Sequence, residues 1–193
     1  MGSLVDVGQF KPLVKLQEHW SVIRTECVAL KRSDILNIDR EDKTHEEVAR
    51  AIIAHGPGWV EGWGEAKAKW LNWVFVIHDH QILGDAGAPN TSALLKHIQG
   101  LKVAALSLFK PGLLLPIHAH PELAREGLLT FHLGLEVPPG ACYLNVDGEF
   151  VPEEAGRALV FDGSRPHYAF NASDEDRLIL YCEFSPERLA WVD

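Results

Sequence analysis

The sequence predicts a mainly β protein with helices at its N-terminal end, whose strands form a β-sandwich or an open barrel. Helical periodicity and a capping motif occur before about residue 70, and seven short segments rich in β-branched and aromatic residues follow. The chain has 193 residues, 47% of them hydrophobic, which suffices for one core. We therefore expect a single domain, 1–193, in which a helical segment, 1–69, packs on a barrel formed by 70–193.

Three helices are predicted. Apolar residues that recur every three or four positions indicate a first helix from about 12 to 29: Leu13, Leu16, Trp20 and Ile23. Thr44 and Glu47 form a capping box ahead of HEEVARAIIA, and Gly56 stands where this second helix would end. A short helix at 92–98, after Asn90 and Thr91, is expected between the first two strands.

The strands are predicted from composition and from their bounding turn residues. In chain order they are WLNWVFV, KVAALSLF, LLTFHLGLEV, CYLNVD, RALVF, PHYAF and RLILYCEF. Four tryptophans, Trp59, Trp63, Trp70 and Trp73, lie near the start of this region, and packing between helix and sheet is the role we expect for most of them.

Charge and composition restrict the partners and the location. A net charge of −9 and a pI near 5.5 argue against a nucleic-acid backbone or an anionic membrane surface as partner. No apolar run reaches the roughly 20 residues of a spanning helix, and MGSLVDVGQF does not resemble a signal peptide, so we expect a cytoplasmic protein. Cys27, Cys142 and Cys182 fit no metal or disulfide spacing and are predicted to be buried free thiols. A homodimer is left open.

The stretch PGLLLPIHAHPE contains two histidines, His118 and His120, separated by one residue. On a strand, residues two apart point to the same face, so both imidazoles could bind one ion. The structural alternative is that one histidine caps the strand and the other donates a hydrogen bond to a backbone carbonyl. The segment 78–80, His-Asp-His, has the same spacing, and we interpret it as a solvated turn.

A third histidine, His167, stands at the entry of a late strand, roughly 47 residues beyond the first pair. A barrel that brings early and late strands side by side would complete a three-nitrogen site. Such open-sided coordination suits Fe(II), although Zn, Cu or Ni also bind imidazoles.

The runs APNTSALLKHIQGLKVAALSLFKPGLLLPIH, HLGLEVP and FDGSRPHYAFNASDEDR resemble the aspartyl/asparaginyl β-hydroxylase family. The resemblance covers roughly residues 59 to 185. It implies a double-stranded β-helix, which is a cupin-like jelly roll, and a non-haem Fe(II) dioxygenase activity that uses 2-oxoglutarate and O2.

Carried over residue by residue, the family's two metal histidines fall on His118 and His167. The family lacks the usual carboxylate ligand two residues after the first histidine and tends to have glycine there. The residue at that place is His120, which could restore a third ligand as nitrogen.

The family's cosubstrate residues are matched in part. Ser107 and Arg177 match the pair that holds the distal carboxylate of 2-oxoglutarate, and His132 matches the histidine for the carboxylate next to the keto group. Thr130 stands where the family has an arginine for that same carboxylate, and Arg125 could compensate from a longer loop.

Each of these residues has an ordinary alternative role. Ser107 could be a small residue facing a strand, Arg177 could pair with Asp174 or Glu175, and Asp162 with Ser164 is expected to shape the turn before His167.

Two other hypotheses remain open. A cupin-like arrangement would use four ligands, His118, His120, Glu126 and His167, without a cosubstrate, for O2 chemistry or Lewis-acid catalysis. The fold could also serve as a non-catalytic metal- or ligand-binding module. For an enzyme, we expect a small-molecule substrate.

Overall fold

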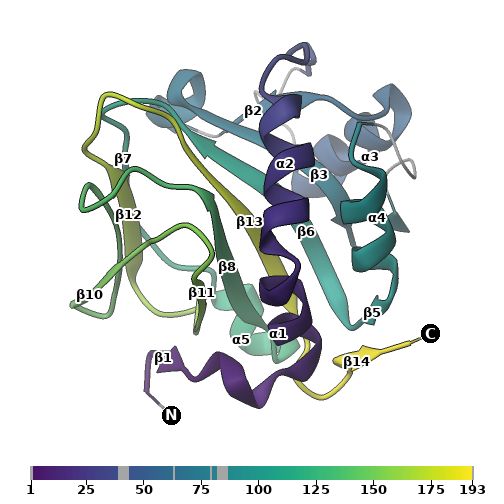
Figure 1. The fold of residues 1–193 in the computed structure, drawn as a ribbon, viewed down its shortest axis with the longest axis vertical. Coiled ribbons are helices and arrows are strands. Elements are labelled where there is room, and N and C mark those ends of the chain that lie inside the picture. Colours follow the sequence, from purple (N-terminus) through teal and green to yellow (C-terminus); the bar gives the residue numbers. More distant parts are fainter. Residues whose placement is uncertain (1, 39–43, 63, 79, 82–86, 193) are drawn as a thin grey trace.

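The computed structural model describes residues 2–38, 44–62, 64–78, 80–81 and 87–192 (Figure 1). The α-helices are α1 (Lys11–Glu18), α2 (Trp20–Leu30), α3 (His45–His55), α4 (Pro89–Lys96) and α5 (Pro121–Glu126), with 3-10 turns η1 (Val7–Gln9) and η2 (Gly64–Lys69). The strands are β1 (Leu4–Val5), β2 (Trp59–Glu61), β3 (Trp70–Ile77), β4 (His80–Gln81), β5 (Ile98–Gln99), β6 (Leu101–Phe109), β7 (Leu114–His118), β8 (Leu129–Glu136), β9 (Cys142–Val146), β10 (Glu149–Pro152), β11 (Ala158–Phe161), β12 (His167–Asn171), β13 (Arg177–Phe184) and β14 (Ala190–Trp191).

Two sheets form the body of the protein. The large sheet has the order β1-β11-β8-β13-β6-β3-β2, with β4 paired to β3, and the small sheet has the order β10-β9-β12-β7. A cavity of about 530 Å³ is lined by residues of both sheets. This two-sheet arrangement confirms the double-stranded β-helix that the sequence predicted.

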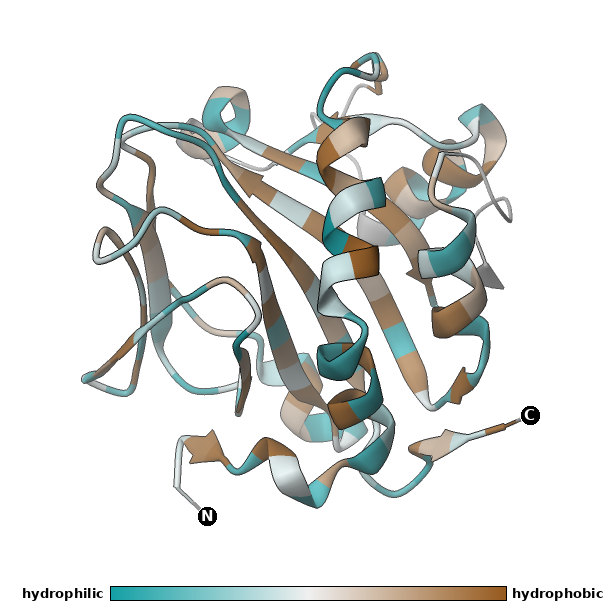
Figure 2. Cartoon of the chain, viewed as in Figure 1, coloured by the Kyte–Doolittle hydropathy of each residue, from teal (hydrophilic) through white to brown (hydrophobic). Residues whose placement is uncertain are grey.

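The large sheet separates the core from the cavity by simple alternation. On β13, Leu178, Leu180 and Cys182 join the main core, whereas Arg177 and Tyr181 line the cavity. Figure 2 shows hydrophobic residues in brown along the neighbouring strands as well, and on β3 a register shift between Val74 and Val76 interrupts the alternation. The polar side chains of Asn72, Ser107, His132 and Arg177 on these strands face the cavity.

The helices cover both faces of the large sheet. Apolar residues of α1, α2 and α4 belong to the main core, and α2 crosses the sheet over β8 (Figure 1). Helix α3 lies on the cavity face instead, where Val48 and Ile52 pack on Val60, Val74 and Ala105. The capping box of Thr44 with Glu47 is confirmed, and Gly56 ends α3 with a φ of 88°.

The expected single helix at 12–29 is wrong, because two helices meet at His19, whose φ is −95° and ψ is 10°. Both helices bury their apolar residues in one core, so the apolar period continues across the break and hides it. The third helix begins at Pro89, three residues before the expected start. Proline suits the first helical position, and the Glu26 carboxylate accepts from the backbone N–H groups of Asn90 and Thr91.

All seven predicted strands are present, but others were missed. Strand β2 lies within the segment expected to be helical and joins the edge of the large sheet. Strand β7 is not among the seven segments predicted as strands, because its side chains break the pattern: Leu114 and Ile117 are exposed and Pro116 interrupts the run. The three cysteines are free and buried, as predicted. Among the described residues, no helix combines the length and the apolar content that crossing a membrane requires.

Gly134 on β8 permits a close approach of the chain after β10. Its N–H donates to the Arg157 carbonyl, and a Cβ at this position would overlap the carbonyl oxygen of Glu154. We expect Gly134→Ala to lower the free energy of unfolding by about 2 kcal/mol, because the backbone must move. Urea unfolding measures this. The matched control is Gly8→Ala, whose new methyl group would have the Asp6 side chain as its nearest neighbour, at 3.3 Å, and an equal effect of both changes would contradict the prediction.

Candidate metal centre

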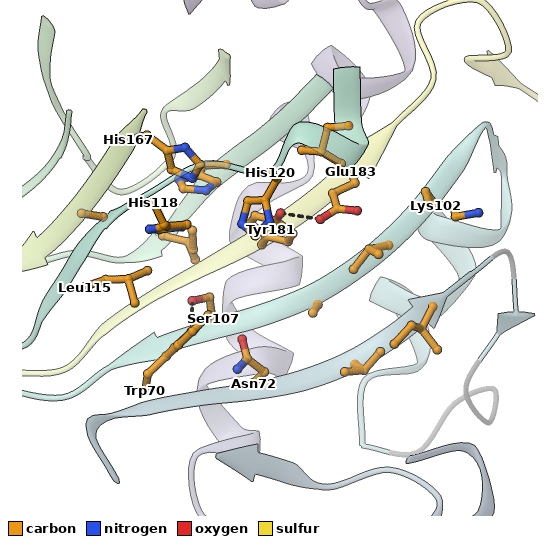
Figure 3. Close-up of a pocket in the computed structure, with 18 of the residues that line it drawn as sticks. Trp70, Asn72, Lys102, Ser107, Leu115, His118, His120, His167, Tyr181 and Glu183 are labelled. Atoms are coloured by element: carbon orange, nitrogen blue, oxygen red, sulfur yellow. Dashed lines mark hydrogen bonds between the residues drawn. The ribbon is translucent and has the colours of Figure 1, made fainter. Parts of the chain in front are cut away.

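Three histidines from separate places in the chain converge at one end of the cavity. His118 ends β7, His167 begins β12 as its cross-strand partner, and His120 lies just before α5 (Figure 3). One ring nitrogen of each lies within 4.8 Å of the others. Among the described residues, this is the group of His, Cys, Asp or Glu side chains that could hold a metal ion.

Backbone and side-chain acceptors orient all three rings in the same way. The Nδ1 atoms of His118 and His167 lie 2.7 and 2.8 Å from the carbonyl oxygens of Pro116 and Arg165. The Nδ1 atom of His120 lies 3.0 Å from Glu122 Oε1. Because these oxygens can only accept, Nδ1 of each ring carries a proton, and Nε2 is the ring nitrogen that remains to bind a metal ion when the ring is neutral.

Burial keeps two of these histidines neutral. It lowers the pKa of His167 from 6.5 to about 4, and the neighbouring His118 and His120 add to the effect. Burial also lowers the pKa of His118. Neutral imidazole is the form that binds a metal ion, so the site is prepared for one at neutral pH.

We expect the metal-free protein to lose stability as the pH falls from about 6.5 toward 4.5. In this range His167 becomes protonated in the unfolded chain but stays neutral in the folded protein, where its pKa is about 4. The free energy of unfolding therefore falls with pH, by up to about 3 kcal/mol once pH 4 is reached. Urea unfolding at several pH values measures the slope, which a His167→Asn variant should largely lose. A flat profile between pH 6.5 and 4.5 would contradict the expectation.

The prediction that both histidines of the H-x-H pair lie on one strand is wrong. Strand β7 ends at His118, and the His120 N–H donates to the Gly163 carbonyl at 3.0 Å as the chain turns into α5. The rings still meet, because Gly163 belongs to the turn that carries His167. In that turn Ser164 donates to Asp162 Oδ1 from both its N–H and its hydroxyl group, which is the turn-shaping role expected of this pair.

Glu126, the fourth ligand of the cupin-like alternative, lines the same cavity but does not join the three histidines. It stands at the end of α5, pairs with Lys102 at 3.5 Å and is not part of the three-histidine group. Arg125 is exposed on the same helix and is not among the residues that line the cavity. His78 of the second H-x-H is an exposed residue with a φ of 48°, and Asp79 lies outside the described residues.

The large sheet presents polar groups to the cavity in register. Asn72 of β3 is the cross-strand partner of Ser107 on β6. Two residues further along the sheet, Tyr181 of β13 is the cross-strand partner of His132 on β8. Trp70 donates from Nε1 to Ser107 Oγ at 3.0 Å (Figure 3). Of the other tryptophans, Trp59 and Trp73 pack edge to face in the core, and Trp63 lies outside the described residues.

Arg177 is held by a residue that was not anticipated. Glu153 accepts from Arg177 Nε at 2.8 Å and from Nη2, and it also accepts from His132 Nδ1 at 2.9 Å. Neither Asp174 nor Glu175 takes this place. Although burial opposes its ionisation, Arg177 and His132 hold the pKa of Glu153 at about 2.

Two of the residues predicted to bind the cosubstrate lie in the cavity, and a third does not. Ser107 and Arg177 line the cavity, and Arg177 Nη1 is buried without a hydrogen-bond partner among the described residues. Thr130 is buried against Gly163 and is not among the lining residues.

Sequence reasoning missed Tyr181 and Glu183, which line the cavity beside His120 and share a 2.7 Å hydrogen bond (Figure 3). Their alternation with Arg177 in RLILYCEF was the signal that could have found them.

Fold and site together define a double-stranded β-helix protein with a three-histidine group in the cavity between its sheets. Residues 17–186 match the aspartyl/asparaginyl beta-hydroxylase family, and the chain belongs to that family.

One relative is the ornithine lipid ester-linked acyl 2-hydroxylase of Rhizobium tropici, 39% identical over 98 residues. The match covers 50% of this chain and 34% of the relative, so the chain spans about a third of that protein.

Solved structures with a similar fold include the DMSP lyase of Ruegeria pomeroyi, with a TM-score of 0.46, 15% identity and coverage of 83% of this chain and 71% of the other. Another is a predicted oxalate decarboxylase of Thermotoga maritima, with a TM-score of 0.44, 17% identity and coverage of 67% and 92%.

Proposed function

We propose that the protein is a metal-dependent hydroxylase that uses Fe(II), O2 and 2-oxoglutarate to oxidise a small molecule with an apolar chain. The observation that supports this most is the position of three available Nε2 atoms in the same cavity as the buried Nη1 of Arg177. Iron bound to the histidines would supply oxygen activation. The chain's own residues bind, orient and exclude water.

The residues present fit an iron ion and one carboxylate. Three imidazoles on one side leave the opposite positions of an ion open. Arg177 Nη1 is a charged donor in need of an acceptor, and the Ser107 hydroxyl can donate beside it, so these two would hold the distal carboxylate of 2-oxoglutarate. Tyr181 and His132 also line this cavity.

The apolar part of the cavity supports a substrate with an alkyl chain. From the histidines it extends along β3 and β6 to the residues of α3, where its lining is aliphatic: Val48, Ile52, Val60, Val74 and Ala105. The relative from Rhizobium tropici is named for hydroxylating an acyl chain, which agrees with this shape. We therefore propose an acyl chain as the part of the substrate that is oxidised.

Turnover tests the proposal. Iron-loaded protein is incubated with O2, 2-oxoglutarate and an ornithine lipid, and succinate and oxygenated lipid are measured by mass spectrometry. We expect both products in a ratio near one, and loss of both in His167→Ala. Succinate without oxygenated lipid would reject this acyl substrate but keep the cosubstrate, and absence of both would reject the proposal.

A three-histidine enzyme without 2-oxoglutarate is the second candidate. Two observations favour it. Thr130 stands at the position where the family has an arginine, and it does not line the cavity. Glu153 already accepts from two of the three guanidinium nitrogens of Arg177. Oxygen uptake with substrate alone, unchanged by 2-oxoglutarate, would support it. Binding of metal with no oxygen uptake under either condition would support a non-catalytic module.

A further inference from the structure

Glu153 reaches the back of the cavity from an unusual place. It follows β10, where its N–H donates to the Cys142 carbonyl at 3.0 Å, and the next residues run beside β8 through a bridge between Ala155 and Gly134. The carboxylate is thereby held behind Arg177 and His132. Both of these line the cavity, whereas Glu153 is not among the lining residues.

The contacts of Glu153 determine what the other two side chains present to the cavity. Two of the three guanidinium nitrogens of Arg177, Nε and Nη2, point to the carboxylate, which leaves Nη1 as the nitrogen without a partner. His132 donates a hydrogen bond from Nδ1 to the same carboxylate, which fixes the ring and leaves the opposite nitrogen, Nε2, as its remaining polar atom. One carboxylate therefore sets the direction of two cavity groups.

Stability alone does not explain this arrangement. Apolar residues of similar volume commonly replace a buried ion pair without loss of stability. This pair also leaves Nη1 buried and unsatisfied, which costs free energy until a ligand oxygen accepts from it. The packing of Arg177 over the Phe109 ring, at 4.3 Å from the centroid, restricts the guanidinium further.

We propose that Glu153 is a positioning residue that aims Arg177 Nη1 at one carboxylate of an oxo-acid ligand, and thereby sets the preference for a dicarboxylate over a monocarboxylate. The inference rests on the proposed use of 2-oxoglutarate. It concerns how Arg177 is oriented and not the metal, because the Glu153 carboxylate bonds to His132 and Arg177 and, among the described residues, to none of the three histidines.

Two ligands that differ in the distal carboxylate test it. Anaerobic Fe(II) protein is titrated with 2-oxoglutarate and with 2-oxobutyrate, and the visible band of the bound oxo acid gives both affinities. The wild type should prefer 2-oxoglutarate. Glu153→Gln keeps the shape but replaces one acceptor oxygen with a donor, so this preference should fall by about tenfold or more, while iron affinity stays unchanged.

Glu153→Asp separates charge from position. It keeps the charge on a shorter side chain, so a positioning role predicts a reduced preference here too, and it serves if the Gln variant does not fold. An unchanged preference in a folded variant would overturn the role of Glu153 and leave the proposed function standing. A wild type that binds neither oxo acid would refute both, and equal loss of affinity for the two ligands would show a merely structural effect.

Discussion

We expect His167→Ala to lower the affinity for Fe(II) by more than about 100-fold. Loss of residues that merely support a ligand costs roughly 10- to 100-fold, and loss of a ligand itself costs more. His167 is the most buried of the three histidines, and its Nδ1 bond to the Arg165 carbonyl leaves Nε2 directed to the others. Equilibrium binding under anaerobic conditions, with a competing chelator, measures the effect.

His55→Ala is the matched control for this change. His55 is exposed at the end of α3, and its Nδ1 also lies near a backbone carbonyl, that of Ala51 at 3.0 Å. It should leave iron affinity as in the wild type. If His167→Ala bound iron as tightly as His55→Ala, the three-histidine centre would be disproved.

The largest loss of stability is expected for Glu153→Ala, at about 3–5 kcal/mol in the free energy of unfolding at neutral pH. The change removes one partner of a buried pair and leaves the Arg177 guanidinium without a counter-charge, at 1% side-chain exposure. His132 loses the acceptor of its Nδ1 proton as well. Denaturant unfolding of the metal-free protein gives the value.

The adjacent glutamate provides a close comparison. Glu154 pairs with Arg157 at 2.9 Å, but both side chains are about half exposed, so Glu154→Ala should cost about 1 kcal/mol or less. Similar losses for the two variants would mean that the buried network contributes no more than a surface ion pair.

The sequence predicted the strands well and the details of the site only in part. Strands such as RLILYCEF were found because apolar and β-branched residues reveal burial on at least one face. The meeting of His118 with His167 followed from the barrel, in which early and late strands pair.

What could not be predicted depends on where the chain turns in space. His120 reaches the site from the start of a helix because its N–H bonds to Gly163, 43 residues later in the sequence, and not because it shares a strand with His118. Glu153 lies outside any strand and meets His132 and Arg177 across 21 and 24 residues. A lone glutamate after a strand gives no periodic signal of such contacts.

A crystal structure of the iron-loaded protein, with anomalous scattering recorded at the iron edge, tests the central claim most directly. The account predicts one anomalous peak per chain, bonded to the Nε2 atoms of His118, His120 and His167, with open positions facing Arg177. A peak elsewhere, or an ion bound by His118 and His167 but not by His120, would contradict it.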